Sequence, residues 1–396
     1  MLLRNARLAD GRTADVRICL ETIDAVADSL VPTAGEDVVD LEGRLLLPAL
    51  AEPHAHLDKA FLAERFENPT GDLLGAVTAM EANRHLITVP DIAERAERAV
   101  RLLVSNGITS IRTHADTTAD NGLRSVEALI GVREKLRHLC DIQVVALTGW
   151  TMKGGQPSTT LALLREAVAM GIDVVGGCPH LDESIERSTD SLLAIAAEAG
   201  LPIDLHTDET LDPHALGLES LARRVLATGF AQPATASHCV SLGMQTEAVQ
   251  RRVAEVVAEA RVSVVVLPQT NLYLQGRDRA VATPRGLTAI GALRAAGANV
   301  CAGADNLQDP FNLVGKGDPL ETAALMVMAG HLLPADAYEY CSARVRTALA
   351  LPPVAVAAGS PAELVAVPAA SVREAIAFQP VGRITIHEGR VVQPAA

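Results

Sequence analysis

The stretch Glu52-Pro-His-Ala-His-Leu-Asp-Lys59 is the part of the sequence from which the fold can be worked out. It follows an apolar run, residues 45–51, of the kind that a buried strand needs. His54 and His56 are two residues apart, so on an extended backbone both side chains point to the same side. Two imidazoles on one face at a strand end form half of a metal site, but a lone H-x-H pair usually arises by chance. The interpretation therefore depends on further ligands downstream.

Strand-like apolar segments alternate with alanine-rich helical patterns through the middle of the chain. Several of the helical patterns end in glycine just before the next strand, as at Gly107, Gly171, Gly200 and Gly297. Eight such β/α units in series favour an α/β fold of the closed (β/α)8 TIM-barrel type. An open doubly wound sheet is the alternative, but no glycine-rich dinucleotide fingerprint follows the first strand. The expected strands are residues 45–53, 110–114, 142–147, 174–178, 203–206, 234–238, 262–268 and 300–304.

Both ends of the chain consist of short strand-like runs separated by turns, such as Asp10-Gly11 and Glu388-Gly389. We expect the two ends to combine into one small domain of the β-sandwich type. The expected bounds are residues 1–44 and 356–396 for this domain and 45–355 for the catalytic barrel.

The composition excludes several classes of partner. The chain has 396 residues, of which 49% are hydrophobic and 2% aromatic, so its core must consist of Ala, Val, Leu and Ile. A formal net charge of −14 argues against nucleic acid or an anionic membrane surface as partner. The six cysteines are far apart, as expected in a reducing compartment. With no signal peptide or membrane-length apolar run apparent, we expect a cytoplasmic protein, and a homo-oligomer is compatible with this composition.

Polar residues end four of the expected strands, and active sites of such barrels lie at the carboxyl ends of the strands. His206 and His238 end the fifth and sixth strands, and Asp305 follows the eighth. Three imidazoles and one carboxylate suit a divalent first-row metal. We therefore expect His54, His56, His206 and Asp305 to bind one Zn²⁺ or Fe²⁺ ion.

Such an ion would lower the pKa of a bound water and supply hydroxide. Hydrolytic deamination also needs a proton carried to the leaving nitrogen, and Glu209, three residues beyond His206, is the candidate, with Asp208 as its rival. His238 would hydrogen-bond the attacking water or stabilise charge on the substrate. Asp305 would serve both as ligand and as base.

Taken together, these motifs resemble the amidohydrolase superfamily and, within it, the cytosine-deaminase-like branch. The resemblance covers nearly the whole chain and implies a metal-dependent deaminase that removes an exocyclic amino or alkylamino group from a small nitrogen heterocycle. It also implies a mononuclear site, because Gly176-Gly-Cys-Pro179 lacks the lysine that binuclear relatives carboxylate. The motifs that carry it, in family order, are residues 52–58, 112–116, 173–180, 206–209, 235–238, 271–277 and 303–310.

The sequence departs from the cytosine deaminases at positions near the expected substrate. Gly149 stands where those enzymes carry the glutamine that reads the pyrimidine, and Asn306 replaces the second residue of their Asp-Asp pair. A glycine has no side chain with which to hydrogen-bond a ring amide. The run at residues 56–61, with its lysine, is closer to the N-isopropylammelide hydrolase type. We therefore expect cytosine to be a poor substrate.

Further residues are candidates for substrate contacts. Trp150 would stack on a flat heterocycle, or else plug the barrel mouth. Lys59 would reach a substrate carbonyl or carboxylate, or else pair with Asp58. The remaining candidates are His114, His180 and Asn306.

Two other functions fit the same residues. One is a metal-dependent hydrolase that opens a cyclic amide or urea, which would release no ammonia or amine. The other is a non-catalytic barrel that binds a small molecule. The presence of Glu209 together with His238 argues against the second, because a binding protein has no use for a proton shuttle.

Overall fold

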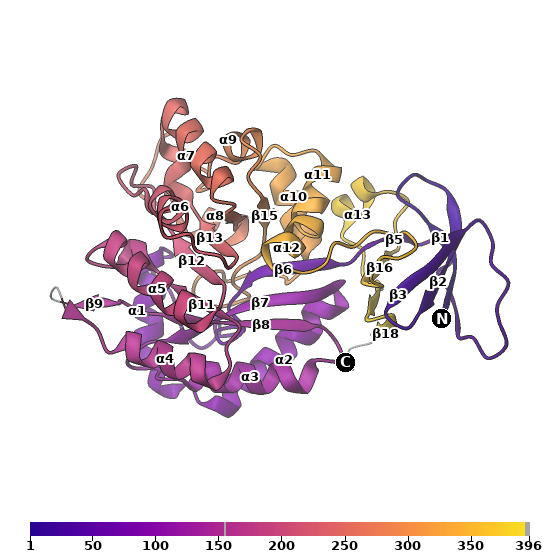
Figure 1. Cartoon of the computed structure of the whole chain (residues 1–396), viewed down its shortest axis with the longest axis horizontal. Helices are drawn as coiled ribbons and strands as arrows, with labels where there is room; N and C mark the ends of the chain where they lie inside the picture. Colours follow the sequence, from indigo (N-terminus) through magenta and orange to yellow (C-terminus); the bar gives the residue numbers. More distant parts are fainter. Residues whose placement is uncertain (154–155, 393–396) are drawn as a thin grey trace.

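The computed structural model describes residues 1–153 and 156–392, and side chains outside 152–157 within these ranges. Figure 1 shows a barrel of parallel strands surrounded by helices, with a separate small sheet at one end of the molecule. The small sheet combines strands from both ends of the chain, so the predicted fold class is confirmed.

The barrel consists of eight parallel strands whose spatial order follows their order in the sequence. The first and last strands meet through a parallel bridge between Ala55 and Asp305, which closes the ring at the level of the predicted metal ligands. Apart from the first, the eight barrel strands lie where the sequence predicted them. They are β6 (Leu50–Ala55), β7 (Ile108–Thr117), β8 (Asp141–Thr148), β11 (Val174–Gly177), β12 (Ile203–Thr207), β13 (Ala234–His238), β14 (Ser263–Val266) and β15 (Val300–Ala302).

The expected first strand, residues 45–53, was wrong in one respect: it is two strands in two different sheets. Strand β5 (Leu45–Pro48) belongs to the small sheet, and β6 starts at Leu50. At the junction the Ala49 N–H donates to the Glu363 carbonyl of the small domain, whereas the Leu50 N–H donates to the Gly107 carbonyl of the barrel. Both sheets bury their strands, so an unbroken apolar run gave no sign of the change.

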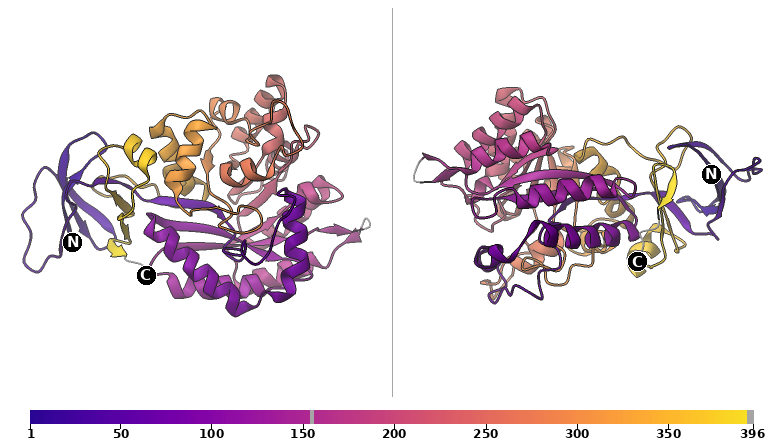
Figure 2. Two further views of the ribbon diagram at one scale, coloured as in Figure 1. Left: turned by 180° about the vertical axis from the view of Figure 1, so that it is seen from behind. Right: turned by 90° about the horizontal axis from the view of Figure 1, so that it is seen from below.

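Helices pack around the outside of the barrel strands (Figure 2). Gly171 and Gly200, which follow α4 (Thr160–Met170) and α5 (Ile185–Ala199), adopt the left-handed conformation, as their position predicted. Helix α1 (Leu73–Asn83) and the short 3₁₀ helix η1 (Arg84–Leu86) instead contribute residues to the pocket at the carboxyl ends of the strands. The remaining helices are α2 (Val89–Ser105), α3 (Arg124–Leu136), α4 (Thr160–Met170), α5 (Ile185–Ala199), α6 (Gly217–Thr228), α7 (Glu247–Glu259), α8 (Pro268–Leu274), α9 (Ile290–Ala295), α10 (Pro319–Met328), α11 (Pro334–Tyr340), α12 (Ala343–Ala348) and α13 (Val372–Phe378).

The small domain is one mixed sheet in the order β18-β17-β16-β5-β1-β2-β3, with β4 paired to β1. Its aliphatic core includes Leu3, Ile23, Leu364 and Ile386 from both ends of the chain. The strands are β1 (Leu2–Arg7), β2 (Thr13–Cys19), β3 (Thr22–Ala27), β4 (Val38–Asp40), β16 (Leu364–Val367), β17 (Ile384–His387) and β18 (Arg390–Val392); a separate hairpin pairs β9 (Met152–Lys153) with β10 (Gln156–Pro157).

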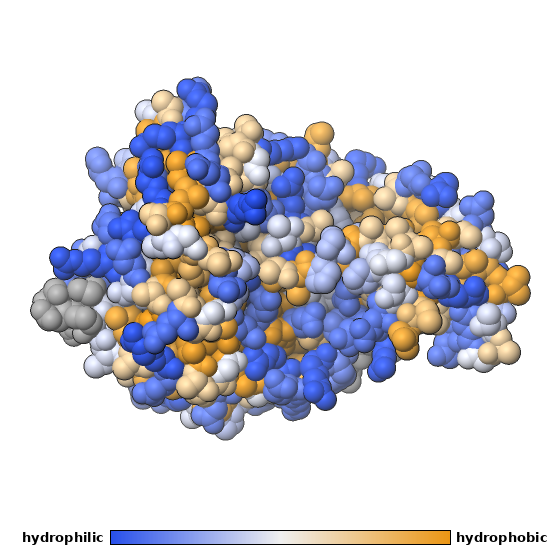
Figure 3. Space-filling model, viewed as in Figure 1, coloured by the Kyte–Doolittle hydropathy of each residue, from blue (hydrophilic) through white to orange (hydrophobic). Residues whose placement is uncertain are grey.

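The face of the molecule in Figure 3 carries hydrophilic residues interspersed with smaller hydrophobic patches. Within residues 1–153 and 156–392, we find no helix with the length and apolarity needed to cross a bilayer. All six cysteines are free thiols, and four of them are buried.

Candidate active site

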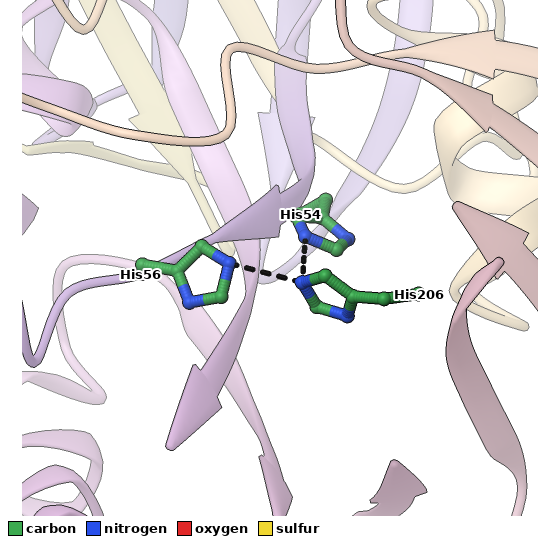
Figure 4. A group of neighbouring side chains, drawn as sticks. All are labelled: His54, His56 and His206. Carbon is green, nitrogen blue, oxygen red and sulfur yellow. Dashed lines mark hydrogen bonds between the residues drawn. The ribbon is translucent and has the colours of Figure 1, made fainter. Parts of the chain in front are cut away.

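The predicted metal ligands converge at the carboxyl ends of the barrel strands. His54 lies on β6 and His206 on β12, while His56 follows directly after β6 and Asp305 lies three residues beyond the end of β15. Figure 4 shows the three rings turned toward one another, with His206 Nε2 lying 3.1 Å from His54 Nε2 and 3.2 Å from His56 Nε2. Asp305 Oδ1 lies 3.6 Å from His54 Nε2 and 3.3 Å from His56 Nε2. His54, His56 and His206 therefore form one group of potential ligand atoms, and Asp305 forms a second group with His54 and His238.

The protonation states and separations of these atoms suit ligands of a metal ion better than hydrogen-bond partners of one another. Burial, reinforced by neighbouring rings and Lys59, lowers the pKa of His54 and of His56 well below the usual range, so both rings are neutral. Bonds of about 2.0–2.1 Å place tetrahedral ligand atoms roughly 3.3–3.4 Å apart, close to the observed separations. Within the described residues, neither oxygen of Asp305 has a hydrogen-bond partner. The buried His and Asp side chains are consistent with a metal site.

Glu209 and His238 lie beside this cluster and face the same pocket. Their side chains approach to 3.5 Å between Glu209 Oε1 and His238 Nδ1. Burial alone raises the pKa of Glu209 to about 8, and burial lowers the pKa of His238 to about 3. His238 Nδ1 also lies 3.1 Å from Asn271 Oδ1, which as an acceptor fixes the proton of the neutral ring on Nδ1. His238 Nε2 is thereby left free to accept a hydrogen bond.

Asp208, the rival of Glu209, has a different position. Its two carboxylate oxygens accept hydrogen bonds from the backbone N–H groups of Gly217 and Leu218, at 2.8 and 2.9 Å. These groups lie at the start of α6, where N–H groups need acceptors and negative charge is favoured. The Asp208 carboxylate therefore caps a helix rather than facing the pocket.

The backbone at the ends of two strands is in the left-handed region. His238 has φ 70° and Asp305 has φ 68°. For residues with a Cβ this conformation costs about 1–2 kcal/mol, and such outliers persist where the surrounding structure imposes them. Here the left-handed residues are the last residue of β13 and a residue three positions beyond β15, and the side chains of both line the pocket.

The pocket combines a polar floor with an apolar wall. The floor contains Glu209, His238 and Asp305, and Lys59 also belongs to the lining of the pocket. A wall of this kind suits the face of a flat ring, while the floor supplies the groups for proton transfer. The apolar lining residues are Leu73, Val77, Met80, Leu147, Leu181 and Phe311.

Lys59 lies in the pocket lining but already has protein partners. Its Nζ lies 2.6 Å from Asp116 Oδ1, 3.4 Å from Asp58 Oδ1 and 3.1 Å from His56 Nδ1. Although burial opposes the charge, the two carboxylates raise the pKa of Lys59 above its usual value. The pairing with Asp58 that was the alternative to substrate binding is thus present, and Asp116 is the closer partner.

The other predicted substrate residues take different positions. Trp150 is 58% exposed and does not belong to the described lining of the pocket, so the structure does not place its indole over a bound ring. His114 is buried, with its ring centroid 3.9 Å from that of His54, one of the predicted ligands. His180 Nδ1 lies 3.1 Å from the carbonyl oxygen of His206. Asn306 lines the pocket and donates to Asp309 Oδ2.

Arg84 and Asn271 are among the residues of the site that the sequence predictions missed. Arg84 lines the pocket from η1 and donates to Asp116 Oδ2 at 2.6 Å. It stands outside any motif, so the sequence offered no signal. Asn271 lies within a quoted motif, but only the fold reveals its contact with His238.

Comparisons with known proteins agree with this arrangement. The sequence pattern described as the Amidohydrolase family matches residues 60–393. A pterin deaminase from Rhizobium rhizogenes is 34% identical over 363 residues, which cover 89% of this chain and 82% of that protein. The crystal structure of the 5-methylcytosine deaminase from Klebsiella pneumoniae, liganded with 5-fluorocytosine, superposes with a TM-score of 0.89 at 28% identity, covering 99% of this chain and 97% of that one.

A further solved structure, the N-isopropylammelide isopropylaminohydrolase from Burkholderia multivorans, superposes with a TM-score of 0.84 at 29% identity over 99% of this chain and 97% of that one. The two superpositions cover the small sheet and the barrel alike, and the family pattern covers the chain from residue 60 to residue 393. On these grounds the chain belongs to the amidohydrolase family.

Proposed function

We propose that this protein is a metal-dependent deaminase that removes an exocyclic amino or alkylamino group from a small nitrogen heterocycle by hydrolysis. One observation carries the proposal: Glu209, His238 and Asp305 line a single pocket together with His56 and His206. The relatives named above support it, because each is a deaminase or an aminohydrolase by name.

Four side chains would hold the metal: His54, His56, His206 and Asp305. The donor set of three imidazoles and one carboxylate suits Zn²⁺ or Fe²⁺. When bound, such an ion activates a water molecule for attack on carbon. The neutral state of the rings, which burial favours, is the state that binds a metal.

Glu209 would carry the proton. With a pKa of about 8, its carboxyl is present in both protonation states near neutral pH, so it can accept a proton and return it to the leaving nitrogen. His238 would orient the attacking water, since its Nε2 is an acceptor and its ring is neutral.

We propose a bicyclic pterin as the first substrate to test. The support is the 34% identity to the pterin deaminase and an apolar pocket lining that includes Leu73 on α1. Gly149 stands where the cytosine deaminases carry the glutamine that reads the pyrimidine, so this protein should turn cytosine over poorly. The loss of one buried hydrogen-bonding partner costs about 1–3 kcal/mol.

The test is a comparison of kcat/KM for pterin, cytosine, 5-methylcytosine and N-isopropylammelide on protein of measured metal content. Ammonia or alkylamine release, together with the product mass, distinguishes deamination from ring opening, because ring opening adds water without loss of nitrogen. We expect amine release from at least one of the four and slow turnover of cytosine. Ring opening alone would contradict deamination, and efficient turnover of cytosine would contradict the proposed specificity.

A further inference from the structure

A continuous chain of buried side chains connects one predicted metal ligand to an arginine inside the barrel. His54 Nδ1 lies 2.9 Å from Ser237 Oγ. Ser237 Oγ lies 3.1 Å from Asp204 Oδ1, and Asp204 Oδ2 accepts a hydrogen bond of 2.8 Å from Arg112 Nη1. All four residues are at most 1% exposed. They come from β6, β13, β12 and β7, so the chain crosses the interior of the barrel.

Arg112 is held at several points, which fixes the position of this chain. Its Nε and Nη2 both donate to Gln143 Oε1, at 3.0 and 2.8 Å, and its Nη1 also donates to Thr235 Oγ1 at 3.2 Å. An arginine side chain stays protonated in proteins. A buried guanidinium needs an anion, and Asp204 supplies it.

The direction of the hydrogen bonds follows from this ion pair. The Asp204 carboxylate can only accept, so the Ser237 hydroxyl must donate its single hydrogen to Asp204. The Ser237 oxygen is then an acceptor toward His54, and the proton of the neutral His54 ring must lie on Nδ1. His54 Nε2 is consequently bare, and this is the atom that faces His206 Nε2 at 3.1 Å.

The other two histidines lack this arrangement. His56 Nδ1 faces the Lys59 ammonium at 3.1 Å, which is a donor rather than an acceptor. His206 Nδ1 is buried and has no hydrogen-bond partner among the described residues. Of these three histidines, His54 is therefore the one whose Nδ1 has a hydrogen-bond acceptor among the described residues. This places the ring proton on Nδ1 and leaves Nε2 free to bind a metal.

We propose that Ser237 and Asp204 are positioning residues that hold His54 in the tautomer and orientation required for metal binding. The inference rests on the proposed role of His54 as a ligand. Partners behind a ligating histidine typically change metal affinity by about 10–100-fold when they are removed. The effect here should appear as metal affinity, with a fold that is otherwise preserved.

The first experiment compares Ser237→Ala with a matched control, Ser110→Ala. Ser110 is also buried on a barrel strand, β7, but its hydroxyl has no partner among the described residues. Zinc affinity would be measured by competition with a chelator, and folding by circular dichroism and thermal melting. We expect Ser237→Ala to bind Zn²⁺ roughly 10-fold more weakly and Ser110→Ala to bind it as the native protein does. Equal affinities in all three proteins would overturn the proposal.

The second experiment reverses the hydrogen bonds instead of removing one. In Asp204→Asn the amide oxygen would face Arg112 and the NH₂ group would donate to Ser237. The Ser237 hydroxyl would then donate to His54 Nδ1, which moves the ring proton to Nε2, the atom that must bind metal. A wrong tautomer is more harmful than a missing partner, so we expect a loss of Zn²⁺ affinity of about 100-fold or more, beyond that of Ser237→Ala.

If Asp204→Asn fails to fold, the pair Ser237→Ala and Ser237→Thr still decides the question, because threonine keeps the hydroxyl and should restore affinity relative to alanine. Failure of this inference is separable from failure of the proposed function. Removal of a ligand in His206→Ala should abolish Zn²⁺ binding whether or not the chain behind His54 matters. If His206→Ala loses the metal while Ser237→Ala and Asp204→Asn keep native affinity, the assignment of the metal site is supported and the positioning role of Ser237 and Asp204 is wrong.

Discussion

Buried carboxylates of the barrel rim and of the small sheet differ in whether their oxygens have hydrogen-bond partners. In the small domain, both oxygens of Asp15 accept backbone N–H groups, and both oxygens of Glu363 accept from His387 and the Glu388 N–H. At the rim, both oxygens of Asp305 and the Nε2 atom of His238 are buried without partners in the described part of the chain. These two carboxylates of the small sheet are satisfied within the protein, whereas no described residue hydrogen-bonds the Asp305 carboxylate at the rim.

The difference indicates where the chain gives up stability for chemistry. An unpaired buried polar atom costs about 1–3 kcal/mol, and the left-handed backbone at His238 and Asp305 adds to this cost. Such departures from local rules concentrate at functional sites. Substitutions at the rim should therefore change activity far more than stability, and substitutions in the small sheet should do the reverse.

The largest expected effect is that of His206→Ala. With three ligands left, the site should lose its metal, and kcat/KM should fall by more than about 10³-fold, beyond the usual scale of a single acid–base residue. The melting temperature of metal-free protein should change little, because the ring now removed has an unpaired Nδ1. Metal analysis of the purified variant is the direct measurement. A full equivalent of bound metal would show that His206 is not a ligand.

The next effect concerns the two neighbouring carboxyls. Glu209→Gln keeps the shape but cannot accept a proton, so turnover should fall by roughly 10²-fold or more with metal retained. Asp208→Asn is the matched control: it weakens the cap on α6 and should lower the melting temperature while sparing most of kcat. Steady-state kinetics on both variants would decide between them, and the reverse order of kcat values would assign the shuttle to Asp208.

A smaller effect is expected in the small sheet. Ile386 is fully buried on β17, and Ile386→Val removes one methylene, which typically costs 0.5–1.5 kcal/mol. Denaturant unfolding should report this loss, while kcat/KM stays within about two-fold of native because β17 contributes nothing to the pocket lining described. A kcat/KM loss larger than the loss of folded protein would mean that the two regions are coupled.

Much of the fold could be predicted from the sequence because its signals are local. The eight barrel strands, the glycine-ended helices and the polar strand ends follow from apolar runs and turn residues, and a barrel converts strand ends into neighbours. The two-sheet division at Ala49 was not predicted, because strands buried in either sheet are equally apolar.

The site was predictable only where a motif marked it. His54, His56, His206 and Asp305 stand at strand ends, so their convergence followed from the fold class. Arg84 reaches the pocket from a segment outside the barrel strands, and no pattern identifies it. The partners of a side chain, such as Asp116 for Lys59, depend on distances between elements that the sequence does not encode locally.

The smallest expected effect concerns the small sheet, where the stability contributed by the hydrogen bond between His387 and Glu363 should depend on pH. Burial disfavours the charged form of His387, but its hydrogen bond to Glu363 at 3.0 Å and the charges of Glu363, Asp141 and Glu388 outweigh this, so the pKa of His387 lies above its usual value. Between the usual His pKa of about 6.5 and the raised folded value, the folded protein binds more protons than the unfolded chain. The stabilisation is therefore complete below pH of about 6.5 and is lost as pH rises through the folded pKa.

We expect the native protein to be more stable than His387→Gln by about 1 kcal/mol, the scale of one hydrogen bond, at low pH, and this advantage to shrink as pH increases. Unfolding free energies of the two proteins from pH 5.5 to 9 measure it, since groups common to both cancel in the difference. An advantage that stays constant or grows with pH would show that His387 is neutral in the folded protein.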